Sequence, residues 1–82
     1  MTSKLIDFHL KQNKISNQII KTRIEINAIN NIAREHNFLF YTKEQMEQWK
    51  QDHLKKVLKK QEKMNELIKK YHDNMNEYVH NL

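Results

Sequence analysis

Three side chains near the end of the chain, Asp73, Glu77 and His80, have the types and the spacing of metal ligands. Residues four and seven positions apart share one face of a helix, so two carboxylates and an imidazole would lie together there, with His72 nearby. A metal site also needs a preformed shell that orients its ligands. The sequence offers no such shell, so we interpret this face as a solvated polar surface and expect neither a metal nor another cofactor.

Other catalytic chemistry has few candidate residues. The chain contains no Gly and no Cys, which excludes a glycine-rich phosphate loop, a cysteine nucleophile and a cysteine zinc site. A catalytic acid or base normally needs burial to tune its pKa. The apolar spacing described below places every carboxylate at an exposed position. We therefore expect a protein that is not an enzyme.

The densest group of charges is the stretch KKVLKKQEK in the second half of the chain, which carries Lys55, Lys56, Lys59, Lys60 and Lys63. Clustered lysines can contact phosphates, with a strong dependence on salt. The stretch has no interleaved aromatic residues for base stacking, and the net charge of the whole chain is only +5. The cluster is either a solvated surface or, as an alternative function, a site that binds nucleic acid or another anionic surface.

The elements that carry these residues are two long helices. The absence of Gly and Pro favours uninterrupted helices, and apolar residues recur in alternating steps of three and four, as in a coiled coil. We expect one all-α domain over residues 1–82, an antiparallel two-helix hairpin with helices at 3–36 and 43–81 and a turn at 37–42. The first expected seam contains Leu5, Phe8, Gln12, Ile15, Ile19, Thr22, Ile26, Ile29 and Ala33. The second contains Leu54, Val57, Gln61, Met64, Ile68, Tyr71, Met75, Tyr78 and Leu82.

The helix ends have their own signals. Ser3 is a candidate cap for the first helix, with Asp7 near its first turn. The stretch TKEQ predicts a capping box between Thr42 and Gln45 at the start of the second helix. Asn37 is the only residue of the turn suited to a left-handed conformation, so we expect it to end the first helix in place of Gly.

One antiparallel register satisfies every layer of the two seams, with facing residue numbers that add to 83. Thr22 then faces Gln61, so the two polar interruptions meet and can satisfy each other. In the same register Gln12 faces a tyrosine hydroxyl, and Phe8 faces Met75. A single polar layer of this kind fixes the register of a coiled coil.

The turn is unusually apolar, with Phe38, Leu39, Phe40 and Tyr41 in a row. One interpretation is a plug, in which Phe38 and Tyr41 fold back on the helix ends above Trp49. The other is a recognition tip that inserts into a partner, with Leu39 left exposed. The two interpretations are compatible, and all five residues are candidate partner contacts.

The first helix has more apolar residues than its seam needs, because Ile6, Leu10, Ile20 and Ile24 lie opposite the seam. The second helix adds Leu58, Leu67 and Val79 on the flanks of its own seam. Exposed apolar area costs about 25 cal/mol per Å², and a two-helix hairpin cannot cover both faces of one helix. We expect a homodimer that forms a four-helix bundle, or another protein, to cover the second face.

The segment from Ile20 to Lys59 resembles the small bacterial sporulation-regulator aspartyl-phosphatases in size, in Arg23 and in the apolar spacing of Met46, Trp49 and Val57. That family forms a helical hairpin that docks on a response regulator. Its motif Ser-Gln-Glu-Leu-Asp would fall on Lys50-Gln51-Asp52-His53-Leu54, where a leucine replaces the final carboxylate. The resemblance therefore implies a shared architecture without the phosphatase activity.

Taken together, these features predict a small non-catalytic protein–protein interaction module, regulatory or inhibitory in role. It would dock an apolar helix face or the aromatic turn on a partner protein or on itself. A structural subunit of a larger assembly is a further alternative. No segment approaches the 18 consecutive apolar residues of a membrane span, and the first residues do not resemble a secretory signal, so we expect a cytoplasmic location.

Overall fold

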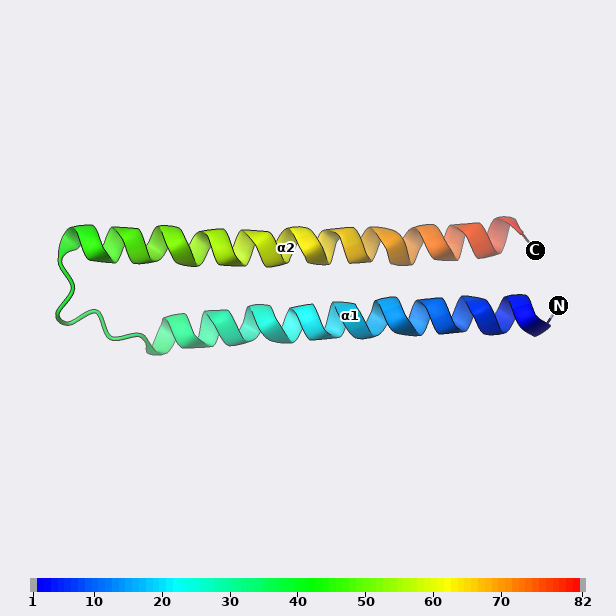
Figure 1. The fold of residues 1–82 in the computed structure, drawn as a ribbon, viewed down its shortest axis with the longest axis horizontal. Helices are drawn as coiled ribbons and strands as arrows, with labels where there is room; N and C mark the ends of the chain where they lie inside the picture. The colour runs from blue at the N-terminus through cyan, green and yellow to red at the C-terminus, as the bar shows by residue number, and fades with distance from the viewer. Residues whose placement is uncertain (1, 82) are drawn as a thin grey trace.

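The computed structural model describes residues 2–81 and is a helical hairpin (Figure 1). Helix α1 (Thr2–Glu35) and helix α2 (Lys43–His80) run antiparallel and are joined by the loop of residues 36–42. The start of α1 and the end of α2 lie at the same end, and the loop lies at the other (Figure 1). The hairpin is a thin rod with dimensions of 64 × 17 × 10 Å. The all-α antiparallel hairpin predicted from the sequence is therefore confirmed.

One of the predicted end signals is confirmed. The amide of Gln45 donates to the Thr42 hydroxyl at 3.1 Å, and the amide of Thr42 donates to the Gln45 side-chain oxygen at 2.9 Å. Two orphan amides at the start of α2 are thus satisfied by this reciprocal capping box.

Two other end signals are wrong. Ser3 is not a cap, because α1 already begins at Thr2 and has no acid in its first turn. Asn37 is not left-handed, because no residue within 2–81 has a positive φ. Its side-chain oxygen instead accepts a hydrogen bond from the amide of Leu39 at 2.9 Å. Asparagine thus turns the chain through an Asx-type bond, which needs no left-handed backbone.

The inward face of α1 is the predicted seam, since its members are buried or half-buried except Leu5. The inward face of α2 is rotated from the prediction. Its buried or half-buried residues from the middle of the helix onward are His53, Val57, Lys60, Met64, Leu67, Tyr71, Asn74 and Tyr78. Leu67 is only 5% exposed and forms the centre of the core with Met64. The predicted seam members that turn outward instead are Leu54, Gln61, Ile68 and Met75, and Leu82 lies outside the described residues.

The predicted register is also wrong, by about one helical turn. Phe8 stacks on Tyr78 with ring centroids 4.2 Å apart, whereas it was expected to face Met75, three residues earlier. The Gln12 side-chain oxygen accepts a hydrogen bond from Asn74 at 3.0 Å, whereas it was expected to meet Tyr71. Because α2 is rotated, an amide–amide layer and an aromatic pair replace the predicted partners.

The predicted layer between Thr22 and Gln61 does not form. Thr22 is 1% exposed, and its hydroxyl donates to the Gln18 carbonyl of the preceding turn at 2.8 Å. A buried threonine can satisfy its hydroxyl within its own helix in this way. Gln61 is exposed and bonds Asn65 of its own helix. Thr22 therefore needs no polar partner from α2, and this polar layer cannot set the register.

Neither helix, within residues 2–81, has an apolar stretch long enough to cross a lipid bilayer.

Candidate interaction surfaces

The loop carries two solvent-exposed apolar side chains, Leu39 and Phe40, which we call the tip. Phe40 is 90% exposed and Leu39 is 75% exposed. The backbone beneath them is fixed, because the amide of Tyr41 donates to the Phe38 carbonyl at 3.0 Å and Leu39 is held by Asn37. The expectation that Leu39 is left exposed is confirmed, and Phe40 is exposed as well.

An aromatic cluster supports the tip from below. His36 stacks on Trp49 with centroids 4.8 Å apart, and Trp49 stacks on His53 at 5.2 Å. Phe38 meets Trp49 edge to face at 5.0 Å. The Tyr41 hydroxyl lies 2.8 Å from the His36 ring nitrogen. The plug interpretation is thus confirmed for Phe38, Tyr41 and Trp49, and the two histidines are members that sequence reasoning missed.

The apolar residues on the back of α1 form a second surface, which we call the outer stripe. Ile6, Leu10, Ile20 and Ile24 are each more than half exposed. Steps of three and four residues place them on one line with exposed asparagines, namely Asn13, Asn17, Asn27 and Asn31. The outer stripe therefore alternates pairs of large apolar residues with pairs of amides.

Helix α2 carries a third surface that sequence reasoning found only in part. Its large apolar residues that face solvent are Leu54, Leu58, Ile68, Met75 and Val79. We call this line the α2 stripe. Leu67, expected on this flank, lies in the core instead. The spacing of these residues in steps of three and four is visible in the sequence. Because each lies next to a residue of the observed seam, several of them were assigned to the seam instead.

The two broad sides of the hairpin differ in chemistry. Successive residues of a helix point about 100° apart around its axis. A residue that follows an inward residue of α2, as Ile68 follows Leu67, therefore faces one broad side of the hairpin. A residue that precedes an inward residue faces the other side. The residues that precede the inward residues are four lysines and four carboxylates, so the second side is charged with both signs. They are Asp52, Lys56, Lys59, Lys63, Glu66, Lys70, Asp73 and Glu77. We call it the charged face.

Of the five clustered lysines, Lys60 is tied to α1. It is half-buried and forms an ion pair with Glu25 across the two helices. The hydrogen bond from Lys60 lowers the pKa of Glu25, against the opposing effect of desolvation, and the charges of Lys60, Lys63 and Lys21 lower it further. The cluster members that remain exposed are Lys55, Lys56, Lys59 and Lys63.

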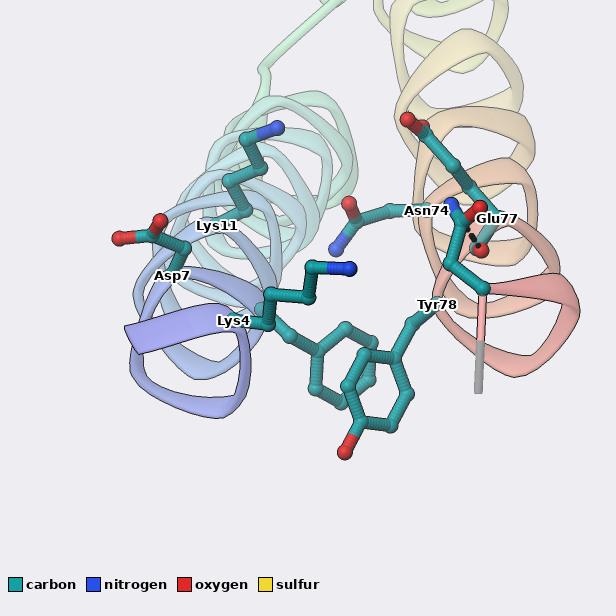
Figure 2. Close-up of a pocket in the computed structure, with 8 residues that line it drawn as sticks. Lys4, Asp7, Lys11, Asn74, Glu77 and Tyr78 are labelled. Carbon is teal, nitrogen blue, oxygen red and sulfur yellow. Dashed lines mark hydrogen bonds between the residues drawn. The ribbon is translucent and has the colours of Figure 1, made fainter. Parts of the chain in front are cut away.

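A pocket of about 320 Å³ opens between the start of α1 and the end of α2 (Figure 2). Phe8 and Tyr78, whose rings stack on each other, both line it. Its lining contains two lysines and two carboxylates, so its charges balance and favour neither an anion nor a cation. The lining residues are Lys4, Asp7, Phe8, Lys11, Asn74, Glu77, Tyr78 and Asn81.

Asp73, Glu77 and His80 are exposed. Across residues 2–81, no three side chains of the metal-ligating types gather closely enough to hold an ion.

The chain was compared with protein-family models, with curated proteins and with solved structures, and none of these comparisons gives a significant match. What the chain does must therefore be inferred from these surfaces.

Proposed function

We propose that this chain is a small non-catalytic protein–protein interaction module that docks its tip, Leu39 and Phe40, on a partner protein. Its role is regulatory or inhibitory, by occupation of the partner's surface, and its setting is the cytoplasm. The observation that carries the proposal is the 90% exposure of Phe40 on a turn held by side-chain and backbone hydrogen bonds.

An exposed aromatic ring on a fixed turn favours binding for two reasons. Aromatic residues are enriched among the few side chains that supply most of the binding energy of an interface. The capping box at Thr42 and the stacked Trp49 already order the turn before binding. Because the loop is already ordered, binding of a partner costs little conformational entropy in it.

The outer stripe supports a second contact with the same class of partner. Its isoleucines supply apolar area, and the asparagines between them can donate and accept hydrogen bonds. A helix that lies along α1 would meet both in alternation, which sets its register as polar layers do in coiled coils.

The test is a site-specific photo-crosslink in the cells that make the protein. Phe40 is replaced by p-benzoylphenylalanine, which keeps an aromatic ring at the tip. Lys70, which is exposed on the charged face, is replaced by the same photo-reactive residue as the matched control. We expect one dominant crosslinked protein from position 40 and none from position 70.

Competition makes the result specific. An excess of unlabelled native chain is expected to remove the crosslink, while a variant with Leu39→Ser and Phe40→Ser is expected to compete at least tenfold less well. Because both residues are exposed, this variant should keep its helical circular dichroism. A crosslink that both competitors remove equally, or no crosslink at position 40, would refute docking by the tip.

A further inference from the structure

The α2 stripe is an apolar surface of the hairpin that the proposed function leaves unused. Ile68 and Met75 are 38% and 39% exposed, and the other three members are at least half exposed. The polar residues that continue its steps of three and four are Gln61, Asn65 and His72, all exposed. These eight positions form a complete second heptad seam on the flank of α2.

We infer that the α2 stripe is the contact surface for a second copy of this chain, with the two α2 helices packed antiparallel. In one register, centred between Asn65 and Ile68, the outer layers of the stripe pair apolar with apolar and polar with polar, while in the central layer Asn65 faces Ile68 of the second copy. Leu54 faces Val79 of the second copy, and Leu58 faces its Met75. Gln61 faces His72 of the second copy, so polar residues also meet. Each contact occurs twice, because a two-fold axis relates the copies.

The flanking charges select this register. Glu62 and Lys69 lie beside the stripe and are exposed. In the centred register Glu62 comes opposite Lys69 of the second copy, and the reverse pair forms by symmetry. A shift of one heptad in one direction brings Glu62 against Glu62, and a shift in the other direction brings Lys69 against Lys69. Like charges placed opposite each other disfavour both shifted registers.

The same charges distinguish the two orientations. A parallel pair would bring each residue of the stripe opposite its own copy, which leaves Glu62 without Lys69. It would also place His72 against His72. The charged face on the opposite broad side carries no apolar residue of α2, so it offers a second copy no apolar contact from that helix. The charges of Glu62, Lys69 and His72 therefore favour the antiparallel pair through the α2 stripe.

The dimer has a consequence for the tip. Because the two α2 helices run in opposite directions, the two loops point to opposite ends of the assembly. Each tip remains uncovered, so one dimer presents two tips. This inference goes beyond docking by the tip and does not depend on it.

The native chain has no cysteine, which makes disulfide trapping a clean test. Two single variants, Leu58→Cys and Met75→Cys, are each purified, mixed and oxidised. In the centred antiparallel register, residue 58 lies beside residue 75 of the second copy. Two copies of residue 58 are then separated by about 17 helical residues, or roughly 25 Å. We expect a disulfide dimer from the mixture and none from either variant alone.

A charge swap tests the register by a second route, with dimer mass measured by light scattering across a range of concentrations. Glu62→Lys alone brings two lysines together and is expected to weaken the dimer at least tenfold. Adding Lys69→Glu restores opposite charges and is expected to return the dimer to within about threefold of the native affinity. Both residues are exposed, so helical circular dichroism should stay unchanged throughout.

Three outcomes would overturn the inference. One is a native chain that stays monomeric at every concentration. Another is a disulfide dimer of Leu58→Cys with itself, which indicates a parallel pair. The third is a double charge variant no better than Glu62→Lys. All three leave the crosslink at position 40 free to succeed or fail separately, because the tip lies outside the α2 stripe.

Discussion

The ring of Phe8 stacks on the ring of Tyr78, with centroids 4.2 Å apart and planes inclined by only 18°. This pair closes the open end of the hairpin, as the aromatic cluster under the tip closes the other end. It also fixes how α1 and α2 are aligned, because the two residues come from opposite ends of the chain.

Coupling between Phe8 and Tyr78 is the direct test of that alignment. A double-mutant cycle with Phe8→Leu and Tyr78→Leu should give a coupling free energy of about 1 kcal/mol, typical of an aromatic pair. Unfolding in urea provides the measurement. The matched control is a cycle of Phe8→Leu with Met75→Leu, where we expect coupling close to zero. The opposite ranking would support the register predicted from the sequence.

The amide layer at Gln12 and Asn74 should limit stability. Gln12 is buried, its oxygen accepts from Asn74, and its nitrogen has no hydrogen-bond partner. Replacing both residues with leucine removes the orphaned donor, so we expect a gain of about 1–2 kcal/mol in the free energy of unfolding. Thermal unfolding followed by circular dichroism measures it. Gln61→Leu, at an exposed position, serves as control and should change stability little; a loss of stability in the double variant would contradict this account.

The ion pair between Glu25 and Lys60 predicts a pH dependence of stability. The pKa of Glu25 is lowered from its usual value of 4.5 in the folded chain. A lowered folded pKa gives stability that is present above the unfolded pKa and is lost as the pH falls through the folded pKa. Stability should therefore fall below about pH 4.5, and Glu25→Gln should flatten part of that fall. Urea midpoints measured from pH 3 to 7 check it, and an unchanged pH profile in Glu25→Gln would exclude the pair as a source.

The outer stripe should matter for partner binding and not for folding. Ile20→Asp with Ile24→Asp alters two residues that are more than half exposed. We expect helical circular dichroism to persist, while the complex captured through position 40 is lost or weakened at least tenfold. Gln18→Asp with Ala28→Asp adds the same two charges to exposed positions of α1 outside the stripe and is the matched control, which should leave binding unchanged. Unchanged binding by the isoleucine variant would exclude the stripe as a partner contact.

The exposed lysines separate the proposed function from anionic-surface binding. Four changes to Glu, which spare Lys60 because it pairs with Glu25, take the net charge from +5 to about −3, since each reverses one charge. The changed residues are Lys55, Lys56, Lys59 and Lys63. We expect the complex at the tip to persist in 150 mM salt. Loss of that complex together with loss of double-stranded DNA binding at low salt would favour the alternative function.

The sequence was sufficient for the hairpin and for the Thr42 cap, because the absence of Gly and Pro, the apolar period and the capping box are local signals. The rotation of α2 was not predictable in this way. Leu67 and Ile68 are neighbours of similar size, and period alone cannot say which turns inward. Lys60 reaches its half-buried position through contact with Glu25, a residue distant in sequence. Thr22 misled the register because its hydroxyl was assumed to need a partner from the other helix.

Of the candidate surfaces, the tip and the outer stripe were identified from residue types alone, since both are apolar where the seam does not need apolar residues. The extent of the α2 stripe depended on the rotation, so Leu54, Ile68 and Met75 joined it only once the structure placed them outside the core. His36 and His53 were missed in the aromatic cluster because their stacking on Trp49 depends on the path of the loop.

The placement of both helix ends beside each other, opposite the loop, determines how the hairpin responds to tension. A force that pulls the start of α1 away from the end of α2 acts on one layer at a time, as on a zipper. The Phe8 and Tyr78 pair breaks first, the Gln12 and Asn74 layer follows, and the aromatic cluster opens last. The tip is therefore the last part of the rod to lose its shape under load.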